Sequence, residues 1–409
     1  MNFTVEDEWL AQLTRVTGHE RFRPYLESIN SVLSKIVSRW KSKEIKIVTI
    51  GGTNGKGETA MSLEYYCQQN GLKTALWTSP HILSVTERMK YDGMNISWVE
   101  LQELSQKYWK LTAELSFYEF LFALFCLWVD TKSVDVVILE VGLGGRYDAV
   151  NIFDADVSAL TSIDLDHQEF LGDTKEKILS EKYPISRPGK PLYTTINDKN
   201  LRGHIQSWAG RDEVQWLDLF ERGWVNSEQC YSQRNRILAA TLFKRLSNEK
   251  DLNIKQIVKL SQLELSLKAR FELMTDGNNQ FIFIGAHNAE GIREMVHTFR
   301  QKGDSFDQVW MSFSKRSQED LESCFKLMTQ SHLFYERLNL CTFNHQKACA
   351  KSDLEFLAKE NNGNKAIQIF DEDGWKRILL SSEGKSLVTG SYYFISAIQR
   401  FLYSRSFNS

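Results

Sequence analysis

The residues best suited to bind phosphate lie at positions 51–57, directly after a short apolar run. Segment 45–50 (IKIVTI) is rich in β-branched side chains and is predicted to be a buried strand. In GGTNGKG, which follows, four glycines surround Lys56, and a helical pattern comes next. Such a turn lets backbone N–H groups and a lysine converge on phosphates at a helix N-terminus. The stretch therefore predicts a phosphate-binding loop. It departs from GxxxxGK[ST] at Ile50 and Gly57, and a surface turn that holds a lysine is the alternative.

Two further positions follow predicted strands of the same region. Glu140 ends the apolar run 134–141, and His167 comes shortly after the apolar run 157–163. The carboxyl ends of parallel strands are where α/β sheets place their ligands. Glu140 is therefore a candidate ligand of Mg²⁺, which prefers oxygen; a salt-bridged structural glutamate is the alternative. His167 is either a metal ligand or a polar loop residue.

The sequence pattern alone says less about Lys182 and His287. Lys182 lies in a predicted helix and by pattern alone is a solvated lysine. His287 belongs to the segment GAHN, which follows the predicted strand 280–284. A glycine and a His-Asn pair at a helix start indicate either a nucleotide contact or a capping histidine.

Composition is typical of a soluble globular protein with two or three domains. The chain has 409 residues, of which 42% are hydrophobic and 25% charged. Its net charge of −2 gives no broad basic face for nucleic acid or an anionic membrane. Six scattered cysteines without a CxxC pair favour a reduced, cytoplasmic setting. The N-terminus lacks the shape of a signal peptide, and the most apolar run, 117–129, is too short to span a bilayer.

Apolar strands alternate with helical patterns in two regions. Strands are predicted at 45–50, 74–78, 134–141 and 157–163, and again at 280–284, 308–313, 339–343, 366–370 and 386–389. Helices are predicted within 5–40, from about 59 to 71, after the capping boxes that begin at Ser97 and Ser116, from about 173 to 183, and through much of 215–265. Segment 79–95 is predicted to be a long loop. The expected fold is α/β: a P-loop-type parallel-sheet ATPase domain (1–265) and a smaller Rossmann-like domain (266–409).

Seven motifs in one order resemble the folylpolyglutamate synthase/dihydrofolate synthase family, a branch of the Mur ligases. They are GTNGKG (52–57), TSPH (78–81), EVGLGGRYDAVN (140–151), LDHQEFLGDT (165–174), EKYPISRPGKP (181–191), ARFE (269–272) and GAHN (285–288). The similarity runs from about residue 18 to the C-terminal GSYYFISAI. The segment LSFYEF (115–120) resembles the family's stretch near the pterin pocket.

The resemblance implies an ATP- and Mg²⁺-dependent amide ligase of folate and one-carbon metabolism. It would join L-glutamate to dihydropteroate or a folate through an acyl phosphate, as a cytoplasmic monomer. The implied catalytic residues are Lys56, His167 and Lys182. The implied Mg²⁺ ligands are Ser79, Glu140, His167 and Lys182, the last after carbamylation. The implied ATP contacts are Thr53, Asn54, Gly55, Lys56, Gly57, Thr59, Asn235, Arg270 and His287, and the ATP site is expected in a cleft between the domains.

The chain departs from the family pattern at several positions. Glu58 stands where the family usually has serine, and places an extra carboxylate beside the expected triphosphate. Ile284 replaces the aspartate before GAHN, the PGRFE motif reads KARFE (268–272), and a loop expected to be rich in lysine and aspartate reads SKRSQ (314–318). These departures keep two alternatives open: a Mur-type ligase for another acid, such as a cell-wall nucleotide precursor, and a non-catalytic descendant that binds pterin or nucleotide.

Overall fold

The computed structural model divides into two compact units, Met1–Leu265 and Ser266–Ser409. It describes residues 3–18, 23–247, 253–263, 270–330, 334–360, 367–381 and 383–406. Among these residues, no helix combines the length and the apolar character needed to cross a membrane.

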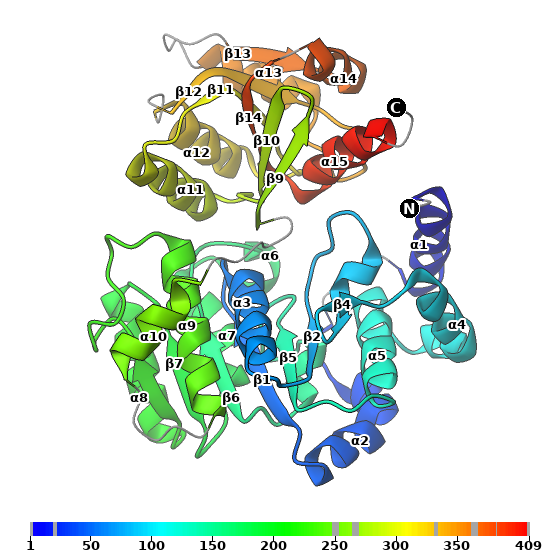
Figure 1. Ribbon diagram of the computed structural model, residues 1–409, viewed down its shortest axis with the longest axis vertical. Helices are drawn as coiled ribbons and strands as arrows, with labels where there is room; N and C mark the ends of the chain where they lie inside the picture. Colours follow the sequence, from blue (N-terminus) through cyan, green and yellow to red (C-terminus); the bar gives the residue numbers. More distant parts are fainter. Residues whose placement is uncertain are drawn as a thin grey trace. The chain divides into compact units, whose positions relative to one another are not determined.

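The first unit is built on an eight-stranded sheet whose strands are mostly parallel (Figure 1). In spatial order the strands are β4 (Met94–Asn95), β3 (Met89–Tyr91), β2 (Thr74–Trp77), β5 (Val136–Glu140), β1 (Lys46–Gly51), β6 (Val157–Leu160), β7 (Pro191–Thr194) and β8 (Gln215–Asp218). Strands β2 to β8 of this order run parallel, whereas β3 and β4 form an antiparallel edge. The carboxyl ends of β2, β5, β1 and β6 therefore lie side by side, which is where the sequence predicts the site.

Helices cover both faces of this sheet. One face packs against α3 (Lys56–Gln69), α9 (Tyr231–Leu246) and α10 (Ile254–Ser261). The other is covered by α2 (Glu27–Ser42), α5 (Phe117–Val129), α7 (Lys175–Lys182) and α8 (Lys199–Arg211). Helices α1 (Phe3–Thr17) and α4 (Trp98–Tyr108) pack against α5 on its outer side. Short helices are η1 (Val85–Arg88), η2 (Trp109–Ala113), η3 (Ala149–Ile152), α6 (Gln168–Leu171) and η4 (Tyr183–Ile185).

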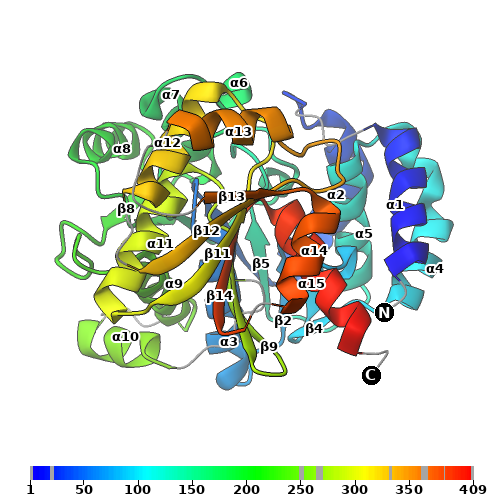
Figure 2. The ribbon, with the colours of Figure 1, turned by 90° about the horizontal axis from the view of Figure 1, so that it is seen from above.

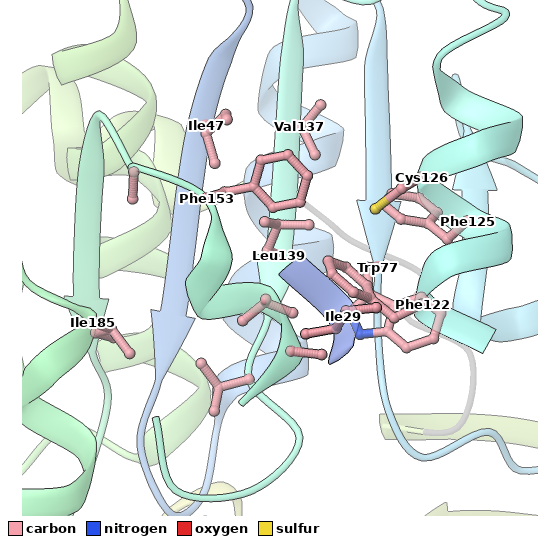
Figure 3. Close-up of a cluster of buried hydrophobic side chains, with 14 of the residues drawn as sticks. Ile29, Ile47, Trp77, Phe122, Phe125, Cys126, Val137, Leu139, Phe153 and Ile185 are labelled. Carbon is pink, nitrogen blue, oxygen red and sulfur yellow. The ribbon is translucent and has the colours of Figure 1, made fainter. Parts of the chain in front are cut away.

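Strand side chains alternate between the two hydrophobic layers. In β5, Val137 and Leu139 point into the layer shown in Figure 3, whereas Ile138 belongs to the opposite layer with α3 and α9. In the first layer, the ring of Trp77 lies 5.3 Å from that of Phe122. Because both faces of β5 are buried, the strand that ends at the candidate metal ligand is held rigidly.

The second unit is a six-stranded sheet with helices on both faces (Figure 2). Its spatial order is β13 (Ile367–Phe370), β12 (Tyr335–Cys341), β11 (Phe306–Ser312), β14 (Lys385–Gly390), β10 (Asn279–Ile284) and β9 (Arg270–Asp276), of which only β9 is antiparallel to its neighbour. Its helices are α11 (Ala289–Lys302), α12 (Gln318–Thr329), α13 (Lys351–Glu360), α14 (Glu372–Ser381) and α15 (Tyr392–Ser406). The expected class, a mostly parallel α/β unit followed by a smaller Rossmann-like unit, is confirmed.

Several expected elements differ from the structure. Segment 79–95 is not a plain loop: it contains η1 and the β3–β4 hairpin, whose turn places Asp92 and Gly93 at φ values of 51° and 79°. Asp-Gly between short strands is a strong hairpin signal, and the length of the segment obscured it. The segment within 5–40 forms two helices, α3 begins at Lys56, and 215–218 is strand. Strands β7 and β9 were not expected.

Candidate active site

The glycine-rich loop is braced by the end of the neighbouring strand β6. The backbone N–H of Thr53 donates to the Ser162 carbonyl at 2.7 Å, and that of Asn54 donates to Ser162 Oγ at 3.0 Å. Gly52 has φ +135°, and a Cβ there would lie 2.0 Å from Thr161 Oγ1. Only glycine fits at this position, because a side chain would meet both backbone strain and a collision. The loop is therefore a preformed turn that is fixed against the end of β6.

The loop continues into the first turn of α3. Gly55 has φ +90°, and its α-carbon packs against the side chain of Asn235 on α9. Thr59 is fully buried and its hydroxyl donates to the Gly55 carbonyl at 3.0 Å. Gly57, which is buried, lies in the same turn. The structure thus gathers the predicted nucleotide residues of the first unit at one helix N-terminus, where anions are favoured.

Two lysines converge on one backbone oxygen of this loop. Lys56 Nζ donates to the carbonyls of Gly52 and Thr53 at 3.1 and 3.0 Å, and Lys182 Nζ donates to the Gly52 carbonyl at 3.0 Å. Lys182 is buried, and burial, followed by the charge of Lys56, lowers its pKa to about 7. Lys182 is not the solvated lysine that its pattern alone suggests. Because its pKa is about 7, a large fraction of this buried amine is neutral near neutral pH.

Ser79 and Glu140 are joined across adjacent strand ends. Glu140, at the end of β5, is 1% exposed, and its Oε2 accepts a hydrogen bond of 3.0 Å from the backbone N–H of Ser79, just after β2. A buried carboxylate that stands beside a serine at this sheet edge offers the oxygen ligands that a hard divalent cation prefers. The residues present fit Mg²⁺. No group of three or more His, Cys, Asp or Glu in the described ranges is arranged to hold a metal, so the predicted set depends on Ser79 and Lys182 as well.

His167 lies in the loop after β6, beyond the residues that brace the glycine-rich turn. It has φ 50°, its side chain is half exposed, and its Nε2 lies 3.9 Å from Asp166 Oδ2. The charge of Asp166 raises the pKa of Lys182, but burial and the charge of Lys56 together lower it by more. The left-handed backbone at His167 is uncommon for a residue other than glycine, and such residues gather at functional sites.

A buried polar chain beside Glu140 was missed at the sequence level. Trp77 Nε1 donates to the Tyr118 hydroxyl at 3.0 Å, and that hydroxyl donates to Asp148 Oδ1 at 3.2 Å. Asp148 Oδ2 accepts from the backbone N–H groups of Gly142 and Leu143 at 2.8 and 2.9 Å. Asp148 was within a recognised motif, but nothing local to it revealed the Tyr118 hydroxyl on α5 or the Trp77 donor behind it on β2.

Glu58, the extra carboxylate beside the expected triphosphate, is held by neutral hydrogen-bond donors. Its carboxylate is turned toward α9, where it accepts hydrogen bonds from the Ser232 hydroxyl and, at 2.8 Å, from Asn235 Nδ2. Glu58 is 7% exposed. The extra carboxylate is therefore accommodated by neutral donors and by the positive end of α3.

In the second unit, Arg270 and His287 belong to neighbouring strand ends. Arg270 pairs with Ile284 in the β9–β10 ladder, and His287 follows three residues after Ile284. The His287 ring lies 5.2 Å from that of Tyr392. Asn288 caps α11 through its side chain, so the capping role suggested for this segment falls to the asparagine. The side chain of Arg270 lies outside the described part of the chain.

Comparisons with known proteins agree over nearly the whole chain. A scan against protein-family models found no match. A dihydrofolate synthase/folylpolyglutamate synthase of Buchnera aphidicola subsp. Baizongia pistaciae is 29% identical, over 97% of this chain and 95% of the relative. The chain is therefore similar, over nearly its whole length, to folylpolyglutamate synthases/dihydrofolate synthases.

Solved structures share the fold of this chain. A Mycobacterium tuberculosis folylpolyglutamate synthase complexed with ADP superposes with a TM-score of 0.82 and 20% identity, covering 97% of this chain and 99% of that one. A bifunctional folylpolyglutamate synthase/dihydrofolate synthase with Mn, AMPPNP and L-glutamate bound gives a TM-score of 0.78 and 24% identity, covering 96% and 98%. At these identities the likeness is one of fold.

Proposed function

We propose that this protein is an ATP- and Mg²⁺-dependent ligase that joins L-glutamate to the carboxylate of dihydropteroate, of a tetrahydrofolate, or of both. The observation that carries the proposal is the meeting of Lys56 and Lys182 at the Gly52 carbonyl, inside a glycine-rich cradle beside the buried Glu140. That arrangement combines a phosphate-binding lysine, a lysine that can become neutral, and a metal-binding carboxylate. The cytoplasmic location and the monomeric state stay predictions.

The loop and Lys56 would bind the β- and γ-phosphates. Lys56 now donates to two loop carbonyls, so its ammonium already lies over the cradle and needs only a side-chain rotation to reach an anion. Backbone N–H groups and the N-terminus of α3 add positive potential where charge develops during phosphoryl transfer. ATP would supply the phosphoryl group, and Mg²⁺ would offset the charge on it.

Ser79, Glu140, His167 and Lys182 would hold the metal ions. Lys182 would become an oxygen ligand if its ammonium loses a proton, the neutral amine adds CO₂, and the carbamic acid formed releases a second proton. A cation beside Lys56 would then be replaced by an anion. This change removes the repulsion between two ammonium groups at one carbonyl oxygen.

The reaction would proceed in two steps. First, an oxygen of the acid's carboxylate attacks the γ-phosphorus, and the bond to the departing ADP breaks. Second, the amine of L-glutamate attacks the acyl carbon, inorganic phosphate leaves, and the nitrogen loses a proton to give the amide. Arg270 and His287, with Asn235, are proposed nucleotide contacts on the strength of the resemblance.

ADP release tests this function when dihydropteroate and tetrahydrofolate are supplied separately with Mg²⁺, ATP and L-glutamate. Turnover should require glutamate and one of the two pterins. Lys56→Ala should lower kcat by at least about 100-fold, since one preorganised charge contact on a transition state contributes roughly 3 kcal/mol. Lys177→Ala, which changes an exposed lysine of the same unit, is the control. A folded protein that binds ATP but shows no turnover with either pterin would contradict the proposal and favour another acid or a binding protein.

A further inference from the structure

Glu58 makes a paired contact with α9 that the proposed reaction does not use. Its Oε1 accepts from the Ser232 hydroxyl, and its Oε2 accepts from Asn235 Nδ2 at 2.8 Å. Glu58 lies in the first turn of α3, directly after the glycine-rich loop, and Ser232 and Asn235 lie in the first two turns of α9. Asn235 is 1% exposed. A buried carboxylate with two neutral donors forms a defined network rather than a mobile surface charge.

This contact determines which way the Asn235 amide faces. An ionised carboxylate can only accept hydrogen bonds, so Asn235 must present its NH₂ group to Glu58 and hold Oδ1 elsewhere. The amide packs on Gly55, where a Cβ would lie 2.6 Å from Oδ1 and 2.7 Å from Nδ2. Within the part of the chain that the structure describes, no group donates a hydrogen bond to Asn235 Oδ1. Oδ1 is therefore an acceptor beside the loop.

We propose that Glu58 is a positioning residue that locks the Asn235 amide so that its Oδ1 accepts a hydrogen bond from the bound nucleotide. The inference rests on the proposed function in that the ligand is ATP. Phosphate oxygens are acceptors and are repelled by Oδ1, so the amide selects a donor. ATP offers two kinds of donor, the 6-amino group of the adenine and the ribose hydroxyls. In this arrangement Glu58 strengthens nucleotide binding, although it brings negative charge toward the phosphates.

The first test measures Mg²⁺-ADP binding by calorimetry and the KM for ATP in variants of the full chain. Glu58→Ser removes the carboxylate acceptor and frees the amide to turn, so ADP binding should weaken by about tenfold, with a smaller change in kcat. Glu64→Gln is the matched control, because Glu64 is a second buried carboxylate of α3 that lies near Lys90 instead of α9. An unchanged or tighter ADP affinity in a folded Glu58→Ser protein overturns the proposal.

A reciprocal exchange separates positioning from a structural role. Asn235→Asp sets two carboxylates against each other and should weaken ADP binding. In the double variant with Glu58→Gln, the amide NH₂ at position 58 donates to the carboxylate at position 235, so the direction of the hydrogen bond is reversed. The other carboxylate oxygen at position 235 stays beside the loop as an acceptor. ADP affinity in the double variant should recover to within a few-fold of the parent. Folding is checked by circular dichroism for each variant, and the double variant decides the matter if Asn235→Asp alone does not fold. Failure to recover in a folded double variant counts against the proposal.

Nucleotide analogues identify the donor. If Oδ1 accepts from the base, ITP, which has a 6-oxo group in place of the 6-amino group, should bind the parent chain more weakly than ATP does. In Glu58→Ser, ITP and ATP should bind with similar affinity. If it accepts from the sugar, 2′-deoxy-ATP or 3′-deoxy-ATP should behave in this way. Equal binding of all four nucleotides overturns the proposal. A chain that binds ADP but ligates nothing removes the proposed function and leaves the role of Glu58 to be decided by these measurements.

Discussion

At the scale of single residues, the buried amine of Lys182 makes folding depend on pH. Burial and the charge of Lys56 lower its pKa to about 7, from an ordinary value of 10.5. Between these two values the unfolded chain binds more protons than the folded chain, so Lys182 contributes stability that increases as the pH rises from about 7 toward 10.5. Below pH 7 both states are protonated, and the full cost of the buried charge is present.

Replacing Lys182 with methionine should therefore flatten the pH dependence of stability. Urea unfolding in CO₂-free buffer between pH 7 and 9.5 should show the parent gaining stability relative to Lys182→Met. Lys177→Met serves as the control, because Lys177 lies on the same helix, is 62% exposed and pairs with Asp173. Parallel pH profiles for the parent and Lys182→Met would show that the Lys182 amine is charged in the folded state at pH 7 and would remove the basis for its carbamylation.

Asp148 should show the opposite trend, over a more acidic range. Burial raises its pKa to about 6, although three backbone N–H groups and the Tyr118 hydroxyl lower it. From about pH 4 to 6 the folded chain holds the proton more tightly, so the contribution of Asp148 to stability falls as pH rises. Asp148→Asn should remove this dependence and cost about 1–3 kcal/mol, since its NH₂ group would face backbone donors. Urea unfolding at pH 5 and 7 measures both effects, and an unchanged pH profile would refute the assignment.

At the scale of elements, the glycine-rich loop depends on a backbone that only glycine adopts. Gly52→Ala places a Cβ 2.0 Å from Thr161 Oγ1 at φ +135°, so the loop must move away from β6. ADP affinity should fall by more than about tenfold, because the N–H groups of the loop no longer converge. Gly71→Ala is a matched control: Gly71 follows α3 at φ +78°, but a Cβ there meets nothing within 4 Å. It should lower stability by about 1 kcal/mol and leave ADP affinity unchanged. Equal effects of the two variants on ADP affinity would contradict this account of the loop.

Elements were predictable from sequence where their signals are local. The capping boxes at Ser97 and Ser116 and the apolar runs around β1 and β5 correspond to elements of the structure within a few residues. Short strands were harder. Strand β7 (PLYT) begins with proline and β8 (QWLD) begins and ends with polar residues, so neither shows the apolar run that marks the equally short β2 and β6. Strand β9 pairs with β10 as an antiparallel edge that the parallel alternation did not suggest.

The residues of the candidate site were also predictable only where a local sequence signal marks them. The glycine-rich loop and Glu140 could be found because a turn composition and a strand end mark them. The partners of Glu58 are more than 170 residues away in the chain, and the Tyr118 hydroxyl that donates to Asp148 lies on α5. Such contacts depend on how the helices pack on the sheet, which no local pattern specifies. The same holds for the burial that lowers the pKa of Lys182.

At the scale of the whole molecule, each unit carries its own hydrophobic core. The first unit has a layer on each face of its sheet, and the second has a core beneath α11, α12 and α13. Units with separate cores generally unfold as separate cooperative transitions. Ligand binding raises the free energy of unfolding of the parts that it contacts. The total gain is RT ln(1 + [L]/Kd), about 2.7 kcal/mol when the free ligand concentration is 100 times Kd.

Calorimetry with Mg²⁺-ADP can therefore determine whether both units contact the nucleotide. If Arg270 and His287 bind it as proposed, ADP should raise the melting temperature of both transitions, because unfolding of either unit releases contacts. His287→Ala should reduce the shift of the second transition while the first still rises. Lys56→Ala should reduce both shifts, because the phosphate contacts anchor the ligand. Arg337→Ala, which changes a surface residue of β12, controls for general effects on the second unit. An ADP shift confined to the first transition of the parent chain would contradict the nucleotide role of Arg270 and His287 and restrict nucleotide binding to the first unit.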